Sequence, residues 1–158
     1  MRLRTDTVFR EALYGLYLAL FRASKNCPTD FHPGRLTTIQ TAIMGIEDHG
    51  WRVIGITPEA LQLLASVGFR KDKLPRQLCR GHVVDRIRTT KLLFEREEPV
   101  HLSEFFERFL ENDTTVIMLT DQNKKGQEFP IFIPIENAGG ELFSNGSLMG
   151  WKHRKKER

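Results

Sequence analysis

Apolar positions recur every three or four residues over the first part of the chain, which is the spacing typical of amphipathic helices. One stripe runs from Val8 to Phe21 and predicts a long helix. A second stripe, from Leu36 to Ile46, predicts another helix that stops at Gly50. The first third of the chain is therefore expected to be helical.

The middle of the chain continues this pattern with less regularity. Thr57-Pro58-Glu59 is a strong helix start, because threonine can cap, proline has a helical φ and glutamate complements the helix dipole. That helix is expected to end at Gly68. Ser103 is predicted to cap a short aromatic helix that ends at Leu110. Residues 83–94 fit either a helix or, at their beginning, a strand.

Beyond Asp113 the spacing changes from helical to alternating. Thr114–Thr120 and Phe129–Ile135 predict a β-hairpin with a loop of several residues, and two prolines favour an edge position for its second strand. A third strand is expected at Glu141–Ser144. Asn145-Gly146 then predicts a tight turn before Ser147–Trp151.

Helices followed by an antiparallel meander indicate an α+β fold, with N-terminal helices packed on a C-terminal antiparallel sheet of three to four strands. Trp51–Ile56 fits a short strand or a buried connector. At 158 residues the chain suits one domain, expected over residues 1–150, with a basic tail at 151–158.

Composition and cysteine usage narrow the class of protein. Hydrophobic residues make up 40% and charged residues 28%, which is ordinary for a globular protein. Cys27 and Cys79 are far apart and form no zinc or redox motif, as is typical of a cytoplasmic protein. The apolar run Ala12–Phe21 is too short to span a bilayer, so no membrane role is expected.

Charge is segregated along the chain, although the net charge is only +4. Basic residues outnumber acidic ones eight to two over residues 69–91. Acidic residues dominate 95–113, and the C-terminus is basic again. Such segregation creates local fields that attract polyanions, although solvated helix faces and a frayed tail would give the same pattern.

The densest group of chemically useful residues lies between Arg80 and Lys91. His82 can transfer a proton near neutral pH, and Arg86 can stabilise the charge that develops on a phosphorane. Either a helix or a strand through this segment could bring His82 near Arg86, so we predict these two as the catalytic residues. The alternative is that His82 is an ordinary surface or cap residue.

Further polar residues are predicted to bind the phosphates and sugars of a substrate. They are Arg80, Arg88, Thr90, Lys91, Lys124, Lys152 and Arg154. Phe143 and Trp151 could stack on bases, although packing is the more ordinary role for aromatic residues in strands. No histidine pair has metal-ligand spacing and no phosphate-binding glycine motif occurs, so neither a metal nor a cofactor is expected.

These features predict a small nucleic-acid-processing enzyme, namely a metal-independent endonuclease acting on RNA rather than DNA. Small metal-independent ribonucleases share the layout of helices before a sheet, a fold-level analogy that no motif narrows to a family. The sequence leaves open whether the protein forms a homodimer.

Two other functions fit the sequence. A non-catalytic DNA- or RNA-binding regulator could use a helix-turn-helix that begins at Thr57, although the turn over Arg70–Pro75 would be unusually long. A protein-interaction module could use the acidic segment 95–113 to meet a basic partner.

Overall fold

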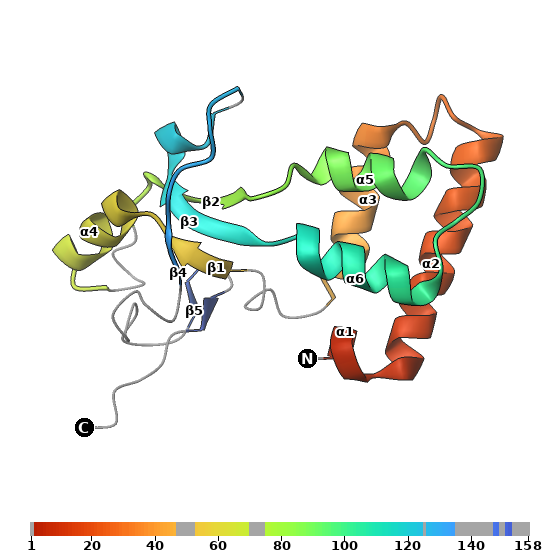
Figure 1. The fold of residues 1–158 in the computed structure, drawn as a ribbon, viewed down its shortest axis with the longest axis horizontal. Helices are drawn as coiled ribbons and strands as arrows, with labels where there is room; N and C mark the ends of the chain where they lie inside the picture. The colour runs from red at the N-terminus through yellow and green to blue at the C-terminus, as the bar shows by residue number, and fades with distance from the viewer. Residues whose placement is uncertain are drawn as a thin grey trace. The chain divides into compact units, whose positions relative to one another are not determined.

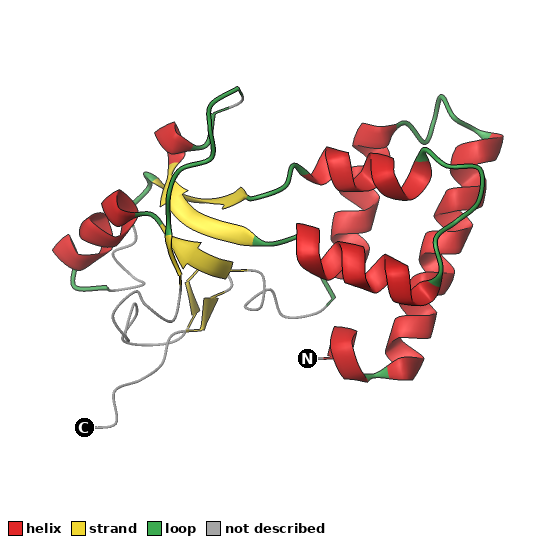
Figure 2. Ribbon diagram, in the orientation of Figure 1, coloured by secondary structure: helices red, strands yellow, loops and turns green. Residues whose placement is uncertain are grey.

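The computed structural model describes residues 2–46, 53–69, 75–124, 126–134, 147–148 and 151–152, the last two pairs by their backbone alone. The chain divides into two compact units. The helical unit comprises Met1–Asp48 and Val84–Asp113, and the sheet unit comprises His49–Val83 and Thr114–Arg158. Figure 2 shows the helices of the first unit in red and the strands of the second in yellow. Each unit is therefore built from two separate stretches of chain.

The described helices of the helical unit include three with side-chain N-caps. The helices of this unit are α1 (Arg2–Thr5), α2 (Thr7–Asn26), α3 (Pro33–Met44), α5 (Arg86–Phe94) and α6 (Leu102–Asn112) (Figure 1). Asp6 caps α2, His32 caps α3 and Asp85 caps α5, each with a side-chain atom that accepts a hydrogen bond from a first-turn backbone N–H. These bonds satisfy donors that have no partner inside the helix.

Aromatic side chains from three helices form the core of the helical unit. Tyr17 of α2 stacks on Phe105 of α6, with ring centroids 4.6 Å apart, and meets Phe94 of α5 edge-on at 5.4 Å. The Tyr17 hydroxyl donates to the Leu93 carbonyl at 2.9 Å and accepts from the Val100 N–H at 3.1 Å. Tyr17 thus joins α2 to α5 and to the segment before α6.

The sheet unit contains a four-stranded mixed sheet of order β2-β3-β1-β4. Its elements are β1 (Val53–Ile56), α4 (Pro58–Ser66), β2 (Leu78–His82), β3 (Thr115–Leu119), the 3-10 helix η3 (Thr120–Gln122) and β4 (Ile133–Pro134). Strand β3 runs parallel to β1 and antiparallel to β2, so that Thr115 pairs with Val53 on one side and His82 on the other. Strand β4 pairs antiparallel with β1. A separate antiparallel pair joins β5 (Ser147–Leu148) to β6 (Trp151–Lys152).

Helix α4 packs on this sheet through a small apolar core. Ala60 and Leu64 of α4 are fully buried in one cluster with Ile56 of β1 and Ile117 of β3. The helix begins as predicted, because the Thr57 hydroxyl accepts a hydrogen bond from the Ala60 N–H at 3.4 Å.

The predicted α+β class is confirmed: helices dominate the first part of the chain, and strands follow toward its end. The sheet differs in one respect, since its β1–β3 pair is parallel. Helix α4 belongs to the sheet unit, whereas α1, α2, α3, α5 and α6 belong to the helical unit. The expectation of one domain over residues 1–150 stays a prediction.

The predicted hairpin of Thr114–Thr120 with Phe129–Ile135 is wrong. Strand β1 lies between β3 and β4, so the two segments do not pair. Of the described residues of the second segment, Ile133 and Pro134 form the strand, which pairs with β1.

Other predicted boundaries differ from those in the structure or lie outside the described residues. Helix α3 ends at Met44, and Gly50 lies outside the described residues. Helix α6 begins after His101, so Ser103 lies inside its first turn and is not the cap. The strand predicted at Glu141–Ser144 lies outside the described residues, as does the Asn145-Gly146 turn. Among the described helices, none has the length and apolarity needed to cross a membrane.

Candidate functional site

Strand β2 carries the predicted catalytic histidine at its end. His82 pairs with Thr115 of β3, and Arg80 pairs with Ile117. Side chains two residues apart in a strand lie on the same face, so Arg80 and His82 are neighbours on β2. Both residues are half-buried, and His82 Nε2 and Arg80 Nη1 are buried atoms. The structure therefore brings an imidazole and a guanidinium to one strand face.

Close packing explains the glycine at position 81, between Arg80 and His82. A Cβ added there would lie 2.5 Å from both Sδ and Cε of Met118, which fills the space that a side chain would need. Gly81 is part of a regular strand, so it neither turns the chain nor leaves room for a ligand on that side.

Arg86 lies at the first position of α5, in the helical unit. Its Nε atom is 3.4 Å from Oδ1 of Asp113, whose side chain is only 7% exposed. A buried carboxylate requires a compensating charge, and Arg86 provides it. Because β2 ends at His82 and α5 begins at Arg86, neither a continuous helix nor a continuous strand joins the two residues. Their catalytic pairing stays a prediction.

The remaining predicted binding residues of α5 divide by helix face. Arg88 and Lys91 are exposed. Thr90 is buried, and its hydroxyl lies 2.8 Å from that of Thr37, which itself donates to the Pro33 carbonyl. Thr90 therefore binds α5 to α3.

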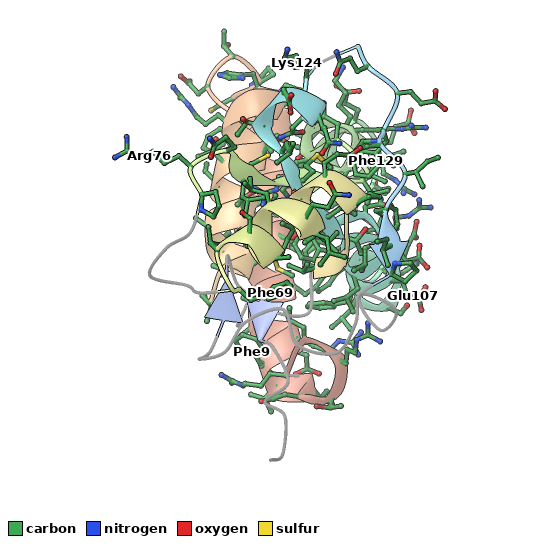
Figure 3. The ribbon with its side chains drawn as sticks, turned by 90° about the vertical axis from the view of Figure 1, so that its left-hand side faces the viewer. Phe9, Phe69, Arg76, Glu107, Lys124 and Phe129 are labelled. Atoms are coloured by element: carbon green, nitrogen blue, oxygen red, sulfur yellow. The ribbon has the colours of Figure 1, made fainter. Side chains whose placement is uncertain are left out.

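Three predicted binding residues lie near or beyond the last strands. Lys124 is exposed in the loop after η3, and Figure 3 labels it, together with Arg76, on the sheet unit. Lys152 belongs to β6, where only the backbone is described. Arg154 lies outside the described residues, as does Phe143.

A small polar cavity between α3, α5 and α6 was not predicted. It has a volume of about 20 Å³, and Gln40, Thr89 and Arg86 line it. Gln40 Oε1 and Thr89 Oγ1 are buried, and neither has a hydrogen-bond partner in the described part of the chain. This volume suits one water molecule, which such groups commonly hold. The signal in the sequence is Gln40 itself, a polar residue on the helix face that also carries the buried Leu36 and Met44.

A second unpredicted polar network involves Gln122, in the sheet unit. The Gln122 Oε1 atom accepts hydrogen bonds from the Thr57 hydroxyl at 2.9 Å and the Leu119 N–H at 3.0 Å. The Gln122 amide donates to Glu59 at 2.9 Å. The pKa of Glu59 is lowered by its own backbone N–H and then by this bond. The network joins the start of α4 to the end of β3.

The structure describes one feature that each alternative function would use. The predicted helix-turn-helix is wrong, because the element that follows α4 among the described residues is strand β2 and not a second helix. In the acidic segment, Glu104 pairs with Arg108 at 2.7 Å and with Arg96 at 3.3 Å. These partners, Arg108 first, lower the pKa of Glu104. Part of the acidic charge is thus already compensated within the unit.

No group of three or more His, Cys, Asp or Glu side chains able to hold a metal ion occurs among the residues that the structure describes. Comparison of the chain with models of known families, with curated proteins and with solved structures gave no match.

Proposed function

We propose that the protein binds nucleic acid, RNA in preference to DNA, and cleaves RNA without a metal ion. The observation that supports this most is the shared face of Arg80 and His82 on β2. Their Cα atoms are separated by roughly 7 Å along the strand, so both side chains can address one phosphodiester group.

In this proposal His82 is the general acid or base. The ribose 2′-oxygen forms a new bond to phosphorus while its proton passes to the imidazole. The bond from phosphorus to the 5′-oxygen breaks, and the departing oxygen takes a proton from water or from the imidazolium. Arg80 binds the phosphoryl oxygens. It takes the role that the sequence gave to Arg86, because it shares a face of β2 with His82.

Nucleic-acid binding without catalysis is the second candidate. The burial of His82 Nε2 favours it, because a general base must reach the proton that it abstracts. In that case Arg88 and Lys91, both exposed on α5, would be the main phosphate contacts.

Cleavage of labelled RNA, single-stranded DNA and duplex DNA, each in EDTA or in Mg²⁺, separates these candidates. We expect cleavage of RNA in EDTA, and a rate about 10²- to 10⁴-fold lower for His82→Ala. His101→Ala is the matched control, since His101 is exposed and its side chain makes no cap bond.

Other outcomes reject part or all of the proposal. Cleavage that requires Mg²⁺, or that His82→Ala retains, would contradict the assigned chemistry. Salt-sensitive binding of intact RNA would select the second candidate. Absence of any nucleic-acid binding at low salt would reject both.

A further inference from the structure

A recess with an apolar floor lies in the helical unit, where the end of α2, the start of α3 and the end of α5 meet. Its volume is about 280 Å³, at the lower end of the range for pockets that take small molecules. Such a volume suits a single ring system rather than a larger ligand.

The floor of this recess is apolar and fixed. Leu36 and Phe94 are core residues, 2% and 5% exposed, and they line it from α3 and α5. Phe31 also lines it but is only half-buried, so part of its side chain remains accessible. An accessible aromatic ring above an apolar floor is a surface on which a flat, weakly polar ring can stack.

The rim of the recess is cationic. Lys25 is held in place, because its ammonium group donates to the Phe94 carbonyl at 3.3 Å and to the Arg96 carbonyl. Lys91 stands on α5, 4.0 Å from Glu95, in a pair whose side chains are both more than half exposed. Exposed pairs of this kind are weak, so Lys91 can exchange this partner for a phosphate.

The cationic rim continues along α5. A neighbouring open depression of about 360 Å³ shares Lys91 and Glu95 with the recess and adds Arg88. Arg88 is exposed and makes no ion pair with any residue that the structure describes. Arg88 and Lys91 are three residues apart and lie on the same helix face.

We propose that this recess takes one unpaired base of single-stranded RNA, stacked on Phe31, while Lys91 and Arg88 bind the adjacent phosphates. The inference rests on the proposed function, because it assumes that the polyanion is RNA. The charge of the rim matches phosphates, and the size of the recess matches one base. A base in a duplex would first have to leave its stack, so single strands should bind more tightly than duplexes.

The test is fluorescence anisotropy with a labelled RNA, single-stranded or annealed to its complement. We expect Phe31→Ala to weaken single-strand binding about 5- to 150-fold, the range for loss of one stacked base. Phe31→Leu keeps an apolar side chain but loses the aromatic ring, so it should weaken binding to a similar extent. Phe31→Trp keeps an aromatic ring and should bind RNA about as tightly as the unsubstituted protein. In Phe31→Trp, RNA should also quench tryptophan emission more than it does in the unsubstituted protein.

Charge and fold require their own controls. Lys91→Ala and Arg88→Ala should each weaken binding, whereas Arg4→Ala, which removes an exposed charge on α1, should not. Circular dichroism establishes that each variant is folded.

The outcomes distinguish failure of the recess from failure of the proposed function. If the unsubstituted protein binds RNA but Phe31→Ala binds it equally, or if duplex binds as tightly as single strand, the recess is not the site. Poly-glutamate that binds with the same dependence on Phe31 would assign the recess to acidic peptides instead. No RNA binding by the unsubstituted protein would reject both proposals together.

Discussion

The Tyr17 hydroxyl forms hydrogen bonds with two buried backbone groups, the Leu93 carbonyl and the Val100 N–H. Tyr17→Phe should lower the free energy of unfolding by about 1–3 kcal/mol, because the Leu93 carbonyl and Val100 N–H would lose their partner. Urea denaturation measures this difference. Tyr14→Phe is the matched control, since its hydroxyl binds the Val100 carbonyl at a part-buried position and should cost less. Equal losses would contradict the role given to burial.

Gln122 is the second residue with a large expected effect. Gln122→Ala should destabilise the protein by about 1–3 kcal/mol, because the fully buried Thr57 hydroxyl loses its acceptor. Gln127→Ala, at an exposed loop position, should change stability by no more than about 0.5 kcal/mol. Thermal or urea unfolding of both variants checks the difference, and equal stabilities would mean that water replaces the network.

Single residues were predictable from sequence where their partners are local. Thr57 caps α4 by accepting a hydrogen bond from Ala60, three residues further on, and the order Thr-Pro-Glu is a recognisable sign of such a cap. Gln122 and Asp113 were not predictable, because their partners, Thr57 and Arg86, are distant in sequence. A polar residue carries no sign of which remote atom it will meet.

At the scale of elements, two glycines allow a matched test of packing. Gly81→Ala in β2 should destabilise the protein by about 1–3 kcal/mol, because the added Cβ would lie 2.5 Å from the end of the Met118 side chain, which is fully buried and would have to move within the core. Gly15→Ala in α2 should instead stabilise it by about 0.5–1 kcal/mol, since no atom lies within 4 Å and alanine favours helix. Chemical denaturation of the two variants measures both signs. Unchanged stability of Gly81→Ala would contradict the packing assigned to Gly81.

Helices were predicted better than strand pairing, for a physical reason. The stripe of α2 depends on residues three and four apart, so the sequence displays it directly. Strand pairing depends on remote partners: Val53 pairs with Thr115, and Gly55 pairs with Pro134. The segment from Thr114 to Thr120 was predicted to be a strand, but the strands that pair with it, β1 and β2, were not predicted as its partners.

At the scale of the whole molecule, acid should destabilise the protein. The pKa of Glu104 is lowered by Arg108 and Arg96, and that of Asp6 by the Phe9 N–H and by Arg2. A carboxyl with a lowered folded-state pKa stabilises the fold above its ordinary value, 4.5 for Glu104, and loses that contribution as pH falls through the folded-state pKa. The midpoint of thermal or urea unfolding should therefore decrease as the pH is lowered below about 4.5.

Glu104→Gln tests this attribution, because it removes one of the titrating groups. Its unfolding midpoint, measured between pH 6 and pH 3, should fall less steeply than that of the unsubstituted protein. Curves of identical slope would show that Glu104 does not contribute to the acid sensitivity.

The sequence also predicted the overall class but not the division into two units. Helical and β patterns are each visible along the chain, whereas the return of Val84–Asp113 to the helical unit depends on tertiary contacts. His82 belongs to the sheet unit and Arg86 to the helical unit, an assignment that local patterns in the sequence did not display. Arg80 stands in place of Arg86 in the proposal because it lies on the same face of β2 as His82.

RNA binding through phosphate contacts, as proposed above, would make the affinity depend on salt concentration. Three contacts, from Arg80, Arg88 and Lys91, predict a slope of about −2 in a plot of log affinity against log salt for single-stranded RNA. The double variant Arg88→Ala and Lys91→Ala should give a shallower slope. Measurable affinity at 50 mM salt with this slope would support RNA binding through phosphate contacts. No binding, or binding that salt leaves unchanged, would contradict it.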